Sequence, residues 1–169
     1  MKIAINDANI LFDLIDLDLI YYLFRLDYSF YTTDMVIDEF KNEHQKAIIQ
    51  SIIKYNNFTV IIIDDITKIF VEKQNYPKLS VQDCSVLVTA IEQSALILTG
   101  DSNLRKTALI KRIEVHGILW VFDKLIEKGL ISSSTAFNKL TDLMSYNSRL
   151  PYEDCSARLE KWKNTNIFS

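Results

Sequence analysis

Short apolar runs alternate with longer amphipathic stretches along the chain. Strands are predicted where the runs are rich in β-branched, aliphatic and aromatic residues, at 2–6, 29–33, 58–63 and 96–99. The run at 58–63 reads FTVIII and is apolar enough for a strand that is covered on both faces. Residues 114–117 predict a further, short edge strand.

The stretches between these runs repeat their apolar residues at helical spacing. The clearest helix begins at Ser80, and its apolar stripe consists of Cys84, Leu87, Val88, Ile91 and Ala95. A second helix spans 118–128 and stops at Gly129, the expected position of a left-handed C-terminal cap. Further helices are expected at 8–26 (two helices), 34–55, 64–76, 102–113, 135–146 and 153–163.

Strands that alternate with helices predict an α/β fold, a three-layer α/β/α sandwich with a mostly parallel central sheet. A length of 169 residues suits one compact unit of this kind. We expect residues 1–130 to form the sandwich and residues 131–169 to form a helical C-terminal extension packed on it. Right-handed crossovers place the loops that follow the strands at one edge, where the site of an open parallel sheet lies.

Composition excludes several classes of site. The chain has only three glycines, too far apart for a dinucleotide-binding loop, a P-loop or a nucleophile elbow. Its two histidines and two cysteines are widely separated, which argues against a zinc site. No apolar run approaches the ~18 residues of a membrane span, and the acid-rich N-terminal segment does not resemble a signal peptide. We therefore expect a cytoplasmic protein without a membrane partner.

The net charge of −3 is unevenly distributed along the chain. Residues 1–40 hold eight acids and two bases, whereas residues 101–169 hold eight acids and eleven bases. One interpretation is a scatter of solvated side chains. The other is a carboxylate-rich site with a basic rim that holds a polyanion, and net charge does not decide between them.

Four acids follow strands of the predicted sheet. Asp7 follows the first strand, and Asp101 follows LILTG. Glu39 lies one to two turns into the helix after the second strand, and Asp83 lies in the first turn of the helix that starts at Ser80. All four therefore map to the same edge of the sheet. Each also has a local explanation, because Asp is a favoured helix N-cap, Ser80 and Asp83 fit a capping box, and Glu39 can be surface charge.

Four like charges in one cleft repel each other and raise their own pKa values unless a cation lies among them. A carboxylate-only ligand set favours Mg²⁺ or Mn²⁺ over zinc. Such a site assists the hydrolysis of phosphodiester bonds. In this interpretation Asp7 and Asp101 are the central ligands, Asp83 holds the same or a second ion, and Glu39 binds or orients the attacking water.

Five further side chains are candidates for supporting roles. Asn9 and Thr99 are placed to align Asp7 and Asp101 by hydrogen bonds. Arg105 and Arg112 lie seven residues apart on one stripe of the helix that begins beside Asp101, with Lys106 adjacent. These bases are candidates for binding substrate phosphates, and a solvated helix face is an equally good interpretation of them.

The segments IAINDANILFDL, TTDMVIDEF, LSVQDCSVLVTA and LILTGDSNLRK resemble, in order and spacing, the four acidic motifs of the PIN domain. This family of metal-dependent ribonucleases includes the VapC-type toxins of bacterial toxin–antitoxin pairs. The match covers residues 1–118, and GILWVFDKLIEKGLIS also resembles the end of a PIN subgroup. The acidic residues of the family fall on Asp7, Glu39, Asp83 and Asp101, its small polar residue on Asn9, and its hydroxyl residue on Thr99.

The resemblance implies a PIN-like fold, dependence on Mg²⁺ or Mn²⁺, RNA as substrate and frequent homodimers. For toxin members it also implies neutralisation by an antitoxin protein. Two features depart from the pattern. Ser102 and Asn103 stand where some members carry a further acid, and the tail beyond Gly129 is longer than in compact VapC toxins.

Three other interpretations are open at this point. A PIN-like domain can bind RNA or protein without cleaving it. Asp64 and Asp65 end a strand with paired acids, as in a receiver domain that takes up phosphate on aspartate. The pair Asp16 and Asp18 faintly resembles a haloacid-dehalogenase nucleophile, but it follows a helical pattern and lacks glycine.

Overall fold

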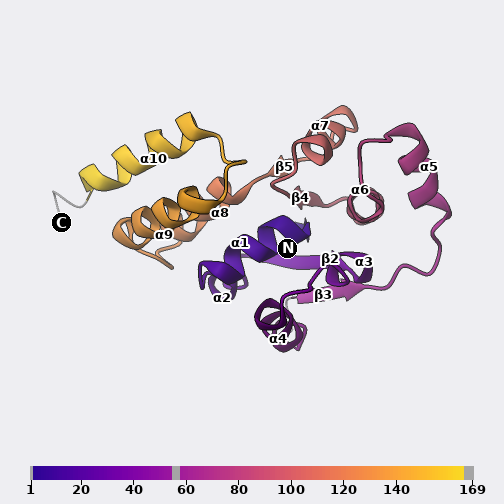
Figure 1. Cartoon of the computed structure of the whole chain (residues 1–169), viewed down its shortest axis with the longest axis horizontal. Helices are drawn as coiled ribbons and strands as arrows, with labels where there is room; N and C mark the ends of the chain where they lie inside the picture. Colours follow the sequence, from indigo (N-terminus) through magenta and orange to yellow (C-terminus); the bar gives the residue numbers. More distant parts are fainter. Residues whose placement is uncertain (1, 55–57, 166–169) are drawn as a thin grey trace.

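A computed structural model describes residues 2–54 and 58–165, and within them a five-stranded sheet lies between helices (Figure 1). All four strand pairs are parallel, in the order β3-β2-β1-β4-β5. The strands are β1 (Lys2–Asn6), β2 (Tyr28–Thr33), β3 (Phe58–Ile61), β4 (Leu96–Leu98) and β5 (Val115–His116). The predicted α/β architecture with a parallel sheet is therefore confirmed.

Strand order reverses between β1, the central strand of the sheet, and its neighbour β4. In register, Ile5 lies beside Ile97 and Asn6 beside Leu98. The chain moves from β1 outward to β3, then returns to β4 and continues to β5. Because crossovers are right-handed, the helices of these two halves cover opposite faces of the sheet. The carboxyl ends of β1 and β4 meet at this reversal point, where open parallel sheets place their sites.

The helices begin and end near the predicted positions. They are α1 (Ala8–Asp16), α2 (Ile20–Leu23), α3 (Asp34–Ile37), α4 (Glu43–Ile52), α5 (Thr67–Asn75), α6 (Val81–Gln93), α7 (Ser102–Ile110), α8 (Ile118–Glu127), α9 (Ser133–Tyr146) and α10 (Tyr152–Thr165). Polar side chains cap several of them: Thr33, Asn42 and Ser132 each accept a hydrogen bond from a backbone N–H of the first turn. Gly129 follows α8 with φ +65°, the left-handed conformation predicted for it.

The prediction of one continuous helix from 34 to 55 is wrong, because two helices, α3 and α4, are separated by a non-helical segment. Phe40 turns inward there, is 3% exposed and packs edge-on against Phe12 with ring centroids 4.7 Å apart. Asn42 then caps a new helix. The chain is therefore not helical where Phe40 is buried. Position 55 of the predicted helix lies outside the described residues.

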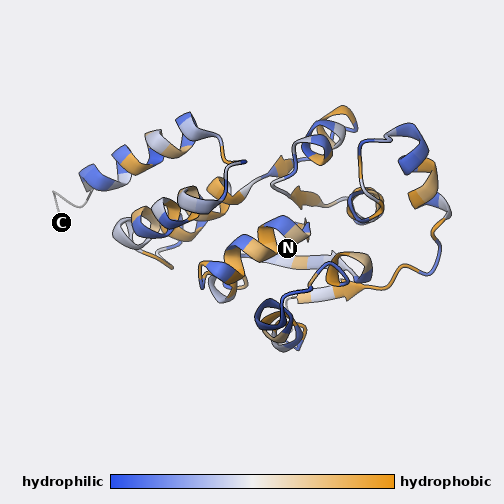
Figure 2. Ribbon diagram, in the orientation of Figure 1, coloured by the Kyte–Doolittle hydropathy of each residue, from blue (hydrophilic) through white to orange (hydrophobic). Residues whose placement is uncertain are grey.

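The C-terminal helices pack on the rest of the molecule through α8. Trp162 of α10 is 3% exposed and meets the ring of Phe122 in α8 at 5.9 Å. Arg158 of α10 donates hydrogen bonds to both carboxylate oxygens of Asp123 in α8. In Figure 2 strand β4 is orange, whereas α10 is mostly blue or pale, as expected of an outer helix with one buried stripe. A domain boundary at residue 130 stays a prediction.

No helix in the described part of the chain has both the length and the hydrophobicity needed to cross a lipid bilayer. The buried apolar side chains instead form a core that runs from the strands into α1, α6 and α8. Phe30 of β2 and Phe122 of α8 are its two largest fully buried side chains. The core therefore holds the sheet and the outer helices in one packed unit.

We expect Trp162→Ala to lower the free energy of unfolding by about 3–5 kcal/mol, because it removes a large buried side chain that seats α10 on α8. Urea denaturation measures the change. Tyr152→Ala, at a residue of the same helix that is 73% exposed, should shift stability by less than about 0.5 kcal/mol. Equal effects of the two substitutions would show that α10 does not contribute to the folded unit.

Candidate functional site

Asp7 is the most enclosed of the four candidate acids. It follows β1, its backbone N–H donates to the carbonyl of Leu98 at 3.0 Å, and the residue is 2% exposed. One carboxylate oxygen, Oδ1, accepts the N–H of Ala8 at 2.7 Å. The other, Oδ2, accepts the side chains of Asn9 at 3.1 Å and Thr99 at 2.7 Å. The two supporting contacts expected at Asp7 are therefore present, and their part in catalysis stays a prediction.

Thr99 connects the ends of β1 and β4. Its buried hydroxyl donates to Asp7 and accepts the backbone N–H of Asp101 at 2.9 Å. Asp101 caps α7, since its Oδ1 accepts the N–H groups of Asn103 and Leu104, each at 2.8 Å. Its other oxygen accepts no hydrogen bond from the described residues. One oxygen of Asp101 is thus committed to the fold, and the other is available to a ligand.

Asp83 and Glu39 approach from α6 and from the turn after α3. Asp83 Oδ2 accepts the N–H of Ser80 at 2.7 Å, and Ser80 Oγ accepts the N–H of Asp83 at 2.9 Å, a complete capping box. Glu39 lies two residues beyond α3, not inside a helix, and its carboxylate accepts no hydrogen bond from any residue that the structure describes. The local capping explanations of Asp83 and Asp101 are therefore confirmed.

Capping does not keep the acids electrostatically independent. Burial raises the pKa of Asp7 to about 6, and the charge of Asp83 adds to the effect. Burial also raises the pKa of Glu39 to about 7, with further contributions from Asp7 and Asp83. The pKa of Asp83 is raised by burial, and Asp101 raises it further. Acids that are up to 76 positions apart in sequence, as Asp7 and Asp83 are, thus lie close enough to interact.

The acids lie near one another but do not form a complete metal-binding site. Within residues 2–54 and 58–165, no three His, Cys, Asp or Glu side chains are arranged closely enough to hold an ion. The donor chemistry nevertheless fits a hard divalent cation, because all four groups are carboxylates, and Glu39, Asp83 and Asp101 each keep at least one oxygen that accepts no hydrogen bond from the described residues. A bound ion would require Glu39 and the capping side chains to move closer together.

One of the three candidate bases, Arg105, contacts this edge of the sheet directly. Arg105 is half-buried and donates to the carbonyls of Thr99 at 3.1 Å and Val115 at 3.5 Å, so its guanidinium ties the ends of β4 and β5 together. A methyl group at Gly117 would lie 2.8 Å from Arg105 Nη2, which shows how closely the backbone approaches it. Lys106 is exposed on α7.

Arg112 does not share the predicted helix stripe. Helix α7 ends at Ile110, and Arg112 follows it with φ +59°. It lies in a shallow depression with Leu96 and Glu114, at the amino-terminal side of β4 and β5 and away from Asp101. The prediction that Arg112 shares a helix stripe with Arg105 is therefore wrong, because the helix is three residues shorter than expected. Binding of substrate by Arg112 stays a prediction, and its position away from Asp101 does not favour it.

Sequence reasoning missed the contribution of the loop between α9 and α10. Arg149 Nη1 donates to Asn9 Oδ1 at 2.8 Å, and Asn147 donates to Asp13 at 3.0 Å. Burial raises the pKa of Asp13 to about 6 in spite of Arg149 and Asn147, which both lower it. These partners are 134 and 140 positions apart, so no local pattern identified them.

We expect the metal-free protein to lose stability as pH rises from about 4 to about 7. Asp7 and Glu39 have raised pKa values in the folded state, so this state binds more protons than the unfolded one in that window. For buried Asp7 the loss is on the order of 3 kcal/mol. Urea denaturation in EDTA measures it, and Asp7→Asn should flatten the slope. Stability that increases with pH over this range would contradict the assignment.

The model of one protein family, described as DUF3368: PIN domain, matches residues 3–164. No curated protein sequence matches the chain. Among solved structures, a protein from Pyrobaculum aerophilum is 13% identical with a TM-score of 0.54, over 75% of this chain and 90% of that chain. At this level of identity, the similarity shows a shared fold.

Two further solved structures overlap less well. A PilT N-terminus domain protein from Sulfolobus solfataricus P2 is 12% identical with a TM-score of 0.48, over 69% of this chain and 87% of that chain. A toxin–antitoxin complex from Klebsiella pneumoniae is 24% identical with a TM-score of 0.46, over 59% of this chain and 87% of that chain. The family match spans the sheet, the acidic segments and the C-terminal helices, and the chain therefore belongs to the PIN-domain family.

Proposed function

We propose that this PIN domain is a divalent-metal-dependent endoribonuclease that hydrolyses phosphodiester bonds of RNA. The observation that carries the proposal is that four acids from four segments lie near the carboxyl edge of the sheet, where neighbouring acids raise one another's pKa values. Membership of the family supports it, because PIN domains are generally nucleases.

The proposed ion is Mg²⁺ or Mn²⁺, held by Asp7, Glu39, Asp83 and Asp101. Carboxylate oxygens are the ligands that these hard cations prefer. Burial, with a further contribution from neighbouring acids, raises the pKa values of Asp7 and Glu39, and a bound cation would favour their charged forms. When bound, it would polarise a phosphodiester oxygen and lower the pKa of a water molecule.

The chain itself would position the reacting groups. Asn9 and Thr99 fix the orientation of Asp7, and the hydroxyl of Thr99 also holds the backbone at Asp101. Glu39, free of hydrogen bonds from the described protein groups, would accept a hydrogen bond from the attacking water and orient it. Lys106, exposed on α7 near Asp101, would contact substrate phosphates.

A non-catalytic role is the second candidate. The described residues hold no preformed cluster of three metal ligands, as expected of a PIN-like domain that binds RNA or protein without cleaving it. The toxin role, an antitoxin partner and a homodimer remain predictions from the family resemblance. The receiver interpretation has no support, because Asp64 and Asp65 lie exposed after an edge strand.

We expect Asp7→Asn and Asp101→Asn each to reduce Mn²⁺-dependent cleavage of labelled RNA by on the order of 100-fold or more. Asparagine keeps one acceptor oxygen for the local N–H groups and removes the charge that would hold the ion. Asp64→Asn, at an exposed acid in the loop after β3, is the matched control and should cleave normally.

A thermal shift assay measures metal binding at the same site independently of RNA cleavage. Saturating Mn²⁺ should raise the melting temperature of the wild type, since a ligand that binds only the folded state stabilises it, and the shift should vanish in Asp7→Asn. Unchanged cleavage in Asp7→Asn would overturn the assignment. RNA binding by the wild type without cleavage in Mg²⁺ or Mn²⁺ would establish the non-catalytic role instead.

Replacing Lys106 by alanine should weaken RNA binding and reduce the slope of log affinity against log salt by about 1, because one phosphate contact is lost. Filter binding of the Asp7→Asn protein at several salt concentrations gives this slope. Arg112→Ala removes a charge at the opposite side of β4 and should leave the slope unchanged. An equal effect of the two substitutions would place the RNA elsewhere.

A further inference from the structure

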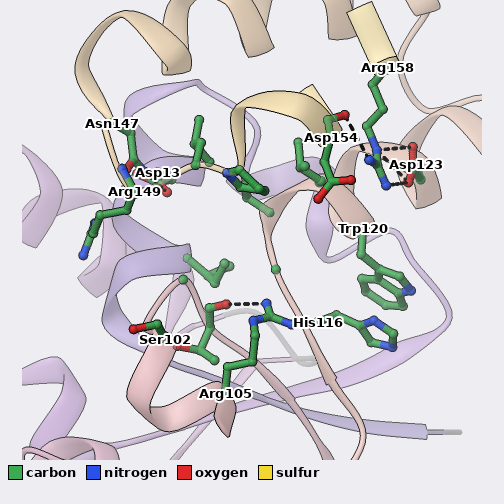
Figure 3. Close-up of a pocket in the computed structure, with 18 residues that line it drawn as sticks. Asp13, Ser102, Arg105, His116, Trp120, Asp123, Asn147, Arg149, Asp154 and Arg158 are labelled. Carbon is green, nitrogen blue, oxygen red and sulfur yellow. Dashed lines mark hydrogen bonds and ion pairs between the residues drawn. The ribbon is translucent and has the colours of Figure 1, made fainter. Parts of the chain in front are cut away.

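A cavity of about 590 Å³ lies beside the proposed catalytic edge (Figure 3). Its walls come from α1, the β4–α7 loop, the β5–α8 segment, the α9–α10 loop and α10. None of the four candidate carboxylates lines it, but Gly100 and Ser102 on either side of Asp101 do. Its volume is within the range of about 300–1,000 Å³ typical of small-molecule sites. It is therefore a separate space that shares one loop with the acids.

The polar groups around the cavity are held in place by protein contacts. Arg105 is fixed by the carbonyl of Thr99, and Arg158 forms a forked ion pair with Asp123, its Nη2 2.7 Å from Oδ2. Asp154 extends toward the centre of the cavity in Figure 3. The lining includes the carboxylates of Asp13, Asp123 and Asp154 as well as three arginines. Arg105 donates only to backbone carbonyls among the described residues, so its positive charge is the one without a carboxylate partner, and Asp154 supplies an acceptor. This combination suits a ligand that has both an anionic group and hydrogen-bond donors.

An aromatic pair forms the wall near β5. His116 and Trp120 stack in parallel, with ring centroids 4.5 Å apart and an interplanar angle of 9°. Tyr28 packs edge-on against Trp120 at 5.5 Å and supports it from the side of the sheet. Both rings of the pair line the cavity. Rigid aromatic walls of this kind accept nucleobases by stacking or by edge contact.

We propose that this cavity binds one unpaired nucleotide of the RNA, adjacent to the bond that is cleaved, with its base against the His116–Trp120 pair and its phosphate toward Arg105. This inference rests on the proposed function, because the shared loop at Asp101 places the cavity next to the reacting bond. Asp154 accepts hydrogen bonds from donor groups of the base or the ribose. Tyr28, which supports Trp120, and Asp154 of α10 would thereby influence which RNA sequences are cleaved.

Calorimetric titration of the full-length Asp7→Asn protein in EDTA tests the site without cleavage or metal. The probes are the four ribonucleoside 5′-monophosphates, ribose 5-phosphate and inorganic phosphate. At least one nucleotide should bind, and ribose 5-phosphate should bind at least about 5-fold more weakly, because it lacks the base that contacts the aromatic wall. Equal affinity for nucleotides and inorganic phosphate would overturn the proposal.

Substitutions of Trp120 locate the site. Trp120→Ala should weaken nucleotide binding about 5- to 100-fold, while Trp120→Phe should retain most of the affinity, since it keeps an aromatic wall. Phe70→Ala, at a half-exposed aromatic residue of α5 outside the cavity, is the matched control and should bind normally. Full affinity in a folded Trp120→Ala protein would place the nucleotide elsewhere.

Fluorescence gives an independent readout that does not need the alanine variant to fold. The chain has two tryptophans, so Trp162→Phe leaves Trp120 as its single tryptophan, which excitation at the red edge of the absorption band selects over tyrosine. Nucleotide should change the emission of Trp162→Phe and leave that of Trp120→Phe unchanged, and the reverse result would overturn the proposal. RNA cleavage by the wild type without nucleotide binding would refute this inference alone. Nucleotide binding without any cleavage would refute the proposed function and leave the nucleotide site standing.

Discussion

The hydroxyl of Thr99 connects the carboxyl ends of β1 and β4 at the point where the strand order of the sheet reverses. It donates to the carboxylate of Asp7 and accepts the N–H of Asp101, which fixes two acids 94 positions apart in one arrangement. The strands β1 and β4 run parallel with Asn6 beside Leu98, so their carboxyl ends lie side by side. The candidate site, the start of α1 and the start of α7 therefore share one buried hydrogen-bonded junction, and every other feature of this edge is positioned relative to it.

Helix capping and ligand binding are compatible at this junction because a carboxylate has two oxygens. Asp101 uses one oxygen to cap α7, and Asp83 uses one to close its capping box with Ser80. The N-terminus of a helix also carries a partial positive charge, which offsets the cost of holding an acid near other acids. Glu39 has no such support, and burial together with the charges of Asp7 and Asp83 raises its pKa to about 7.

Sequence alone was sufficient for the features that depend on local pattern. Strand runs, caps and the parallel topology follow from hydrophobic spacing, and the convergence of Asp7 and Asp101 follows from that topology. The structure departs from the sequence prediction where tertiary packing competes with local preference. Burial of Phe40 ends α3 early and places Glu39 in a turn. The contact of Arg149 with Asn9 joins distant segments, and the local sequence around either residue carries no sign of the other.

The same contact has a consequence for the order in which the site is built during protein synthesis. All four acids have left the ribosome's active centre by residue 101, whereas Arg149 follows 48 residues later. At about 5–20 residues per second this delay lasts roughly 2–10 s. A nascent chain would therefore expose its acidic edge before the loop that walls the neighbouring cavity exists. Any partner that shields this edge has a window in translation in which to act.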